Sequence, residues 1–302
     1  MAKKILAILL ALTFVFAFAA CGGNGDDETT TAPVETTADP FAEVEDTTAA
    51  VEDTTAAAIE DTTAAVEDTT AATVEDTTVA DETTTEAAKA IPQTKAEIVE
   101  YYNTAINNAK KNSKSIHSNY MKHAVAGEIT GIPKALDSIG QSLIKDNMGE
   151  DDSKKNVTWT SAEDKNAFFP VENETWASKL TADDVKEAKL VEKDGKYIIR
   201  ITTKDDPRSE SYKHGSGHAP KAFNVVLPGI IDGYIPGVVK SMFSVGTVAT
   251  AYPASTVQVT VDAATGNVLS ANYMMYWTLY IPLSGTDVVL PFSTENDYTI
   301  NW

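Results

Sequence analysis

The chain has few of the residues that most often carry enzyme chemistry. Its 302 residues include one cysteine, Cys21, and four histidines. A single cysteine excludes an intramolecular disulfide and a zinc site made from cysteine pairs. Because Cys21 directly follows an N-terminal apolar run, the rest of the chain has no thiol for nucleophilic catalysis.

The complete motifs of common enzyme classes are missing as well. The sequence contains no G-x-S-x-G, no phosphate-binding Walker loop, no dinucleotide-binding G-x-G-x-x-G and no H-E-x-x-H. These motifs place nucleophiles, phosphates or metals in the best-known active sites. We therefore predict that the protein is not an enzyme and needs no cofactor.

One short segment is the strongest local candidate for a metal site. HGSGH contains His214 and His218, and two imidazoles spaced by four can bind one metal ion when a helix presents them. Here two glycines place the pair in a loop, so further ligands would have to come from Asp205, Asp206 or Glu210. A metal-dependent extracellular enzyme that uses His214 and His218 is the alternative function. An exposed flexible loop is the simpler interpretation.

Negative charge is concentrated in one part of the chain. Residues 22–90 hold 19 Asp and Glu and one Lys, whereas residues 91–302 hold 25 acidic and 21 basic residues, in a chain of net charge −20. VEDTT-like units recur five times from Val44 onward, with one Val or Ile each. Since this composition offers no continuous apolar seam and repels itself, we predict a disordered acidic Thr-rich tether over residues 21–90. The nearly balanced charge of the remainder argues against nucleic-acid binding.

The first 20 residues have the pattern of an export signal. Lys3 and Lys4 precede an uncharged run of 16 residues, 5–20, that is rich in Leu, Phe and Ala. A basic start, an apolar stretch and small residues at its end are typical of a secretory signal peptide. The run is shorter than the about 20 apolar residues that a membrane span needs. We therefore predict a signal peptide over residues 1–20.

The junction around Cys21 resembles the lipobox of bacterial lipoproteins. Ala19, Ala20 and Cys21 stand in the order of that motif, with Gly22 after them and Phe18 where the family more often has leucine. The resemblance implies that the thiol of Cys21 is acylated and becomes the first residue of the mature protein. It places the protein outside the cytoplasm, anchored in the cell membrane by lipid and facing the cell wall.

Residues 91–302 are predicted to form one folded domain that begins with helices. Thr94 and Glu97 have the spacing of a capping box. The apolar residues that follow fall on one helical face, at Ile98, Tyr102, Ala105 and Ala109. A second stripe predicts another helix, with Ile132, Leu136, Ile139 and Leu143 on its apolar face.

The second half of the domain shows the period of β-strands. Asp194-Gly195 separates two apolar runs and predicts a tight hairpin. Val257, Val259 and Val261 alternate with polar residues, and a long strand follows over residues 269–281. The C-terminal DVVLPFSTENDYTINW predicts two short strands around residues 293–297. Helices followed by strands predict an α+β fold, with N-terminal helices packed on one face of a curved antiparallel β-sheet meander.

Most of the chain is also similar to uncharacterised lipoproteins of clostridial-type Gram-positive bacteria. The shared features are the lipobox, the Thr/Glu/Asp-rich tether, the segment EIVEYYNTAINNAKK and the segment VTVDAATGNVLSANY. A weaker similarity, to lipoprotein carriers with a half-barrel sheet and a helical lid, rests on the arrangement of elements alone. Both resemblances imply a surface location, and neither supplies an activity.

An apolar segment, residues 225–252, is the most unusual part of the domain. Only Asp232 and Lys240 are charged in it, and glycines and prolines interrupt any long helix. It predicts either a short buried helix or a lid over an apolar pocket on the sheet. In the second case the pocket is lined by Tyr234, Met242, Tyr273, Met275 and Trp277.

The favoured function at this stage is a non-catalytic binding or structural module at the cell surface. Its predicted partners are the membrane, through the lipid on Cys21, and an apolar small molecule or a cell-wall or surface partner. We expect a monomer and no nucleic-acid partner.

Overall fold

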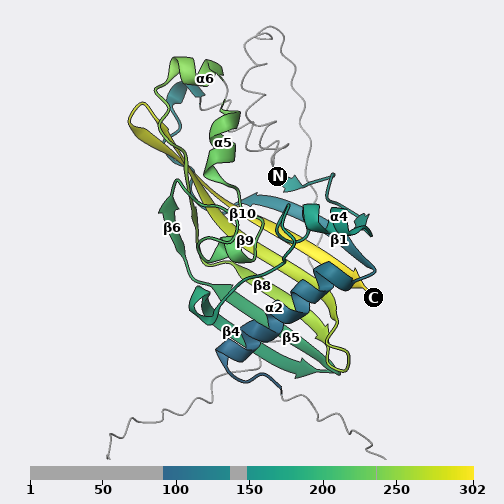
Figure 1. Ribbon diagram of the computed structural model, residues 1–302. Helices are drawn as coiled ribbons and strands as arrows, with labels where there is room; N and C mark the ends of the chain where they lie inside the picture. Colours follow the sequence, from purple (N-terminus) through teal and green to yellow (C-terminus); the bar gives the residue numbers. More distant parts are fainter. Residues whose placement is uncertain (1–90, 137–147, 236) are drawn as a thin grey trace, which may run out of the picture. The chain divides into compact units, whose positions relative to one another are not determined.

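A computed structural model describes residues 91–136, 148–235 and 237–302 of the chain (Figure 1). The predicted signal peptide and tether, together with most of the second predicted helix, lie outside these residues. The described part is built around one ten-stranded antiparallel sheet and has few helices, so it is mostly β.

The strands pair in the order β2-β1-β10-β9-β8-β5-β4, β3 also pairs with β1, and β7 pairs with both β9 and β6. Their bounds are β1 Ser115–Val125, β2 Gly149–Glu150, β3 Val157–Trp159, β4 Val185–Lys193, β5 Lys196–Thr203, β6 Asp206–Ser209, β7 Ala249–Tyr252, β8 Thr256–Asp262, β9 Val268–Leu283 and β10 Thr286–Asn301. The helices are α2 Lys95–Asn112, α4 Ala162–Phe168, α5 Pro228–Tyr234 and α6 Gly237–Met242, with short 3₁₀ turns η2 Lys134–Leu136, η3 Ala182–Asp184 and η4 Ala219–Lys221.

The first predicted helix is confirmed as α2. Thr94 accepts a hydrogen bond from the backbone N–H of Glu97, and the Glu97 side chain accepts one from the backbone N–H of Thr94. The predicted apolar face is buried, and α2 lies across one face of the sheet (Figure 1). At the centre of this contact the hydroxyls of Tyr102 and Tyr273 are 3.2 Å apart.

The predicted hairpin at Asp194-Gly195 is confirmed, and the structure contains a second one. Asp194 and Gly195 connect β4 to β5 with φ angles of 52° and 69°, the left-handed conformation that a type I′ turn requires at both positions. The second hairpin joins β8 to β9. The register shifts at Thr260/Val261, so the buried face of β9 starts at Val268 instead of the predicted residue 269.

The prediction for the C-terminal segment is wrong. Residues 286–301 form a single strand, β10, which pairs with β9 on one side and with β1 on the other. The run STEND suggests a turn because it is polar throughout. In the structure its members alternate between a buried face, with Thr294 and Asn296, and an open face, with Glu295 and Asp297.

The apolar segment 225–252 is divided among α5, α6 and β7. Ile231 and Ile235 are buried, as a helix against the core requires, whereas Ile230 and Met242 are 45% and 52% exposed. In the part of the chain that the structure describes, no helix has the length and apolar character needed to cross a membrane.

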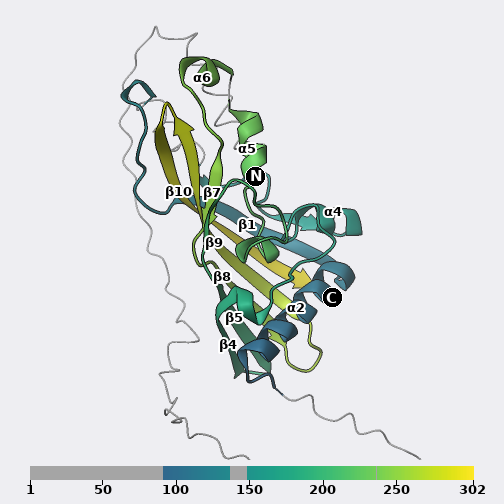
Figure 2. The same ribbon diagram turned by 60° about the vertical axis from the view of Figure 1, so that its left-hand side comes forward.

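The two faces of the sheet differ in their cover. The face under α2 carries the apolar core, which includes Ile201, Val259 and Tyr273. The segment before α5 also packs on this face, where the ring of Phe223 meets Tyr273 edge-on with centroids 5.6 Å apart. No described helix lies over the other face of β4, β5, β8 and β9, as the edge-on view in Figure 2 shows.

Candidate functional site

The face of the sheet that no described helix covers, called the open face, carries two parallel rows of mostly polar side chains. Successive side chains of a strand point to opposite faces, so apolar residues that enter the core leave their neighbours on the open side. The first row crosses the strands through register partners, in the order Lys189, Arg200, Gln258, Asn272, Asp297 and Tyr120. The second row runs beside it through Glu187, Thr202, Thr256, Met274, Glu295 and Lys122.

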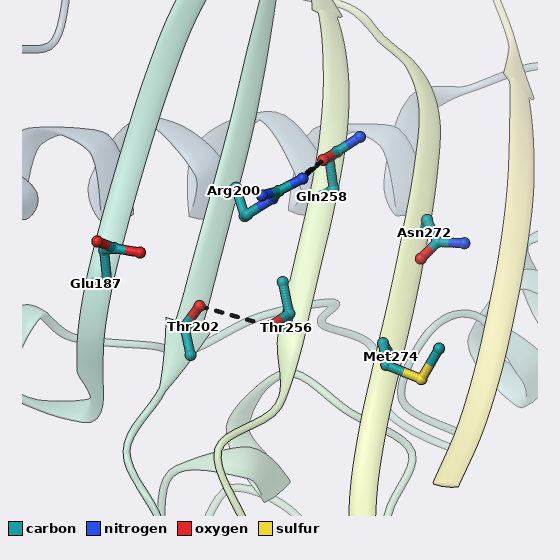
Figure 3. Close-up of a pocket in the computed structure, with 7 residues that line it drawn as sticks. All are labelled: Glu187, Arg200, Thr202, Thr256, Gln258, Asn272 and Met274. Atoms are coloured by element: carbon teal, nitrogen blue, oxygen red, sulfur yellow. Dashed lines mark hydrogen bonds between the residues drawn. The ribbon is translucent and has the colours of Figure 1, made fainter. Parts of the chain in front are cut away.

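A hollow of about 410 Å³ lies where these rows cross the central strands. Its lining consists of Glu187, Arg200, Thr202, Thr256, Gln258, Asn272 and Met274. Figure 3 shows these side chains on the face turned away from α2, which passes behind the strands. The volume lies in the range of small-molecule sites, roughly 300–1,000 Å³. Apart from Met274, every lining side chain offers a hydrogen-bonding group.

The positive charge of the hollow is held over β8. The guanidinium of Arg200 donates to Gln258 Oε1 from both Nε and a terminal nitrogen, at 3.3 and 3.0 Å. Beside this pair the hydroxyls of Thr202 and Thr256 are 3.5 Å apart. Glu187, at the outer edge, pairs with Lys189 at 3.0 Å. Arginine suits a ligand carboxylate because its planar fork matches two oxygens at once.

Negative charge continues the site onto β10. The amide nitrogen of Asn272 donates to Glu295 Oε1 at 3.0 Å and to Asp297 Oδ2 at 3.2 Å, which ties both carboxylates to the hollow. Asn119 donates to Asp297 at 2.6 Å and Tyr120 donates to Glu295 at 2.9 Å. Burial and the nearby Glu295 carboxylate raise the pKa of Tyr120, so its hydroxyl stays a donor.

Within the described ranges, the hydrogen-bond donors to these two carboxylates are all neutral. Among the described residues neither Glu295 nor Asp297 forms an ion pair, although Lys122 lies opposite Glu295 in the register. The donors to them within the described ranges are an amide of Asn119, an amide of Asn272 and the Tyr120 hydroxyl. The site thus has a cationic side at Arg200 and an anionic side at β10.

Three of the predicted pocket residues lie together, but within the core. Tyr273, Met275 and Trp277 alternate along β9 on the face under α2 and are 2%, 1% and 6% exposed. Trp277 donates its ring N–H to Thr294 at 3.1 Å. Met242 lies apart from them on α6 and its side chain is exposed. Tyr234 lies in α5, and its side chain is not among those that the structure describes.

The two predicted metal ligands are separately engaged. His214 Nδ1 lies 3.7 Å from Glu174 Oε1, and burial lowers the pKa of His214. His218 Nδ1 lies 2.9 Å from Asp184 Oδ1, which also accepts from Lys221 at 2.6 Å. Across the described ranges, no group of three or more His, Cys, Asp and Glu side chains is arranged to hold a metal ion.

The HGSGH loop has a structural explanation. Asp206 accepts hydrogen bonds from the backbone N–H groups of His218 and Ala219, and burial raises the pKa of Asp206 against the lowering effect of these donors. Gly217 has φ of 78°, and a Cβ at this position would lie 2.7 Å from Asp206 Oδ1. The loop therefore fits around a buried carboxylate, which explains a glycine at 217 without a metal.

Sequence reasoning did not single out the residues of the open face. A signal was present, because Arg200 and Gln258 occupy the polar positions of strands whose apolar alternation was recognised. What joins them to Asn272 and to Glu295 is the pairing of β5, β8, β9 and β10, which a single strand's pattern does not contain.

Comparison of the chain with models of protein families, with curated proteins and with solved structures finds no match.

Proposed function

We propose that the protein is a lipid-anchored, extracytoplasmic binding module that recognises its ligand on the open face of the sheet. The carrying observation is the hollow of about 410 Å³ in a face that combines Arg200, the amides of Gln258 and Asn272, and two carboxylates that form no ion pair with any described residue. Tyr273, Met275 and Trp277, which were expected to line an apolar pocket, are buried in the core under α2. Their burial favours the open face as the binding surface. The proposal assigns no bond-making chemistry to the site.

The membrane anchor and the surface location remain part of this proposal. The lipobox-like sequence around Cys21 supports them, and the acidic tether of residues 21–90 would hold the domain away from the membrane. Two or more acyl chains give stable membrane attachment, whereas one chain is marginal.

We also infer an α+β class, with further N-terminal helix beyond η2 packed on the face that α2 covers. The apolar stripe from Ile132 to Leu143 supports it. Backbone NMR chemical shifts for residues 132–143 test this inference, because helical shifts would support it and extended shifts would contradict it.

Anchoring is tested with Cys21→Ser. Without the thiol no thioether to lipid can form, so we expect an unprocessed precursor or release of protein into the medium. The measurement is fractionation of cells followed by intact mass. A variant that stays in the membrane at the mature mass of the unaltered protein would contradict lipidation at Cys21.

Use of the open face is tested by photo-crosslinking in the native cells. A photo-reactive amino acid at Thr256 lies in the hollow, and a matched one at Glu100 lies on the exposed surface of α2. We expect a specific adduct from position 256 and none from position 100. Equal labelling at both positions, or no adduct at 256, would contradict ligand binding on this face.

A further inference from the structure

We propose that the ligand of the open face is a neutral sugar chain, whose hydroxyls bind the side-chain amides of Gln258 and Asn272 and whose C–H groups pack on Tyr276. This inference rests on the proposed binding function and names the chemical class of the ligand. It follows from the way in which charged neighbours orient two neutral amides at the centre of the sheet.

The amide of Gln258 turns its nitrogen into the hollow. Arg200 donates to Gln258 Oε1 from both Nε and a terminal nitrogen, at 3.3 and 3.0 Å. A guanidinium only donates, so the amide atom that faces it is the oxygen and the NH₂ group lies on the other side. In Figure 3 this nitrogen lies on the side of β8 nearer to β9. It has no hydrogen-bond acceptor among the described residues, so its two N–H groups can donate to a ligand.

The amide of Asn272 has the opposite orientation. Its nitrogen donates to Glu295 and Asp297 on β10, at 3.0 and 3.2 Å. Ionised carboxylates only accept, so Asn272 Oδ1 points away from β10, as Figure 3 shows. Gln258 and Asn272 are register partners, and within the described ranges no hydrogen bond joins their side chains. A donor and an acceptor therefore lie side by side over the junction of β8 and β9.

Sugar hydroxyls match this pair, because each hydroxyl both donates and accepts. One hydroxyl of a sugar ring can accept from Gln258 while its neighbour donates to Asn272. The hydroxyls of Thr202 and Thr256 lie in the same hollow and have the same double capacity. An arginine alone would suit a carboxylate, but the two donors of Arg200 that point to Gln258 make a neutral amide the group that is presented next to β9.

Apolar contact for a sugar ring is available in line with the amides. Met274 lines the hollow, and Tyr276, two residues further along β9, is 39% exposed on the same face. The negative face of an aromatic ring attracts the C–H groups of a sugar. Asn272, Met274 and Tyr276 follow one another along the strand at intervals of about 7 Å, so linked sugars can lie along β9 and use the amides and the tyrosine ring together.

The place of the hollow in the sheet argues against a peptide. Extended peptides commonly add to the open edge of a sheet, where unpaired backbone groups bind them. The hollow instead lies over β5, β8 and β9, each of which has a strand on both sides. Met274 is the one apolar residue among those that line it, so an apolar side chain or ligand would find little cover.

The test uses the detergent-solubilised full-length protein and an array of neutral oligosaccharides of four to six sugars. Matched arrays of oligosaccharides that contain uronic acids and of tripeptides serve as comparisons. We expect binding to neutral members, and titration calorimetry of the best of them gives the affinity. Because the ligand carries no charge, the affinity should change by less than about twofold between low and high salt. A preference for a charged array that weakens with salt would contradict a neutral ligand.

Variants on the open face test each contact. Gln258→Glu keeps the shape and an oxygen for Arg200 but replaces two donors by an acceptor, so the affinity should fall about tenfold. Tyr276→Ala should weaken binding about threefold or more, whereas Tyr276→Phe keeps the ring and should bind like the unaltered protein. Met242→Ala, at an exposed side chain on α6, is the control and should have no effect. Unchanged melting temperatures show that each variant is folded.

The role of Arg200 is tested by combining two substitutions. Arg200→Gln removes the group that orients the amide, so it should weaken binding in the unaltered protein. In the Gln258→Glu background there is no amide to orient, and Arg200→Gln should cause no further loss. Equal losses in both backgrounds would show that Arg200 does not act through Gln258.

The outcomes separate this inference from the proposed function. A failure to bind any neutral oligosaccharide, or binding that Gln258→Glu and Tyr276→Ala leave unchanged, would overturn the sugar assignment. In either case a specific adduct at position 256 would still support binding on the open face. The absence of that adduct as well would contradict the proposed function itself.

Discussion

The two faces of one sheet show how differently the same strands can be used. On β9, Tyr273 is 2% exposed under α2, whereas Met274, the next residue, lines the hollow on the open side. The buried face is apolar and covered by α2 and by the segment that contains Phe223. The open face instead keeps hydrogen-bonding and charged side chains in register across several strands. Stability should therefore depend on one face and recognition on the other.

The largest effect should come from truncating the buried face. Tyr273→Ala removes an aromatic ring and its contact to Tyr102, and we expect a loss of about 3–5 kcal/mol in the free energy of unfolding. Met274→Ala on the same strand should cost about 1 kcal/mol, because its side chain is half-buried. Urea denaturation measures both. Similar losses for the two variants would break the contrast between the faces.

The HGSGH loop can be tested at its two glycines. Gly217→Ala brings a Cβ to 2.7 Å from Asp206 Oδ1 at a φ of 78°, and we expect a loss of about 2–3 kcal/mol. Gly215→Ala has a similar φ of 79°, but its nearest contact is 3.7 Å, so only the backbone cost of about 1 kcal/mol remains. Thermal unfolding compares them. Equal melting temperatures would show that Asp206 does not constrain position 217.

Acid should weaken the contacts of Asp184 with His218 and Lys221. Burial alone would raise the pKa of Asp184, but hydrogen bonds from Lys221, His218 and Thr181 outweigh it and lower the pKa to about 2. The folded-state pKa is depressed, so its contribution is complete above the unfolded value of about 3.9 and is lost as the pH falls toward 2.

From this difference in pKa we expect Asp184 to contribute about 2 kcal/mol to the free energy of unfolding at neutral pH. Asp184→Asn should therefore be less stable than the unaltered protein at pH 6, with the difference shrinking between pH 4 and 2. Denaturant midpoints at several pH values measure this. A constant difference over that range would mean that the charge of Asp184 is not responsible.

The smallest change in stability should come from the open face. Arg200→Gln and Glu295→Gln alter half-buried side chains outside the apolar core, so we expect changes within about 1 kcal/mol. Binding should fall while the melting temperature stays nearly constant. A loss comparable to that of Tyr273→Ala would show that this face holds the fold together as well.

Local features of the fold were predictable, and those that depend on distant pairing were not. The Thr94–Glu97 capping box and the Asp194-Gly195 turn act over a few residues, and both are confirmed. β1 was not predicted because SIHSNYMKHAV mixes polar residues into both faces, and β10 was divided for the same reason. The polar face was visible strand by strand, but its two rows exist only through the register of the sheet.

The central position of β10 has a consequence for the order of folding. β1 pairs with β10 from Ser115↔Asn301 to Val125↔Phe292, so this pairing closes loops of well over a hundred residues. Sheets dominated by such distant contacts form slowly, because the entropy of closing the loop is lost before the contacts compensate. Until the last strand is available, β1 and β9 each present an unsatisfied edge. The sheet is therefore complete only once the C-terminal residues, up to Asn301, are available to pair.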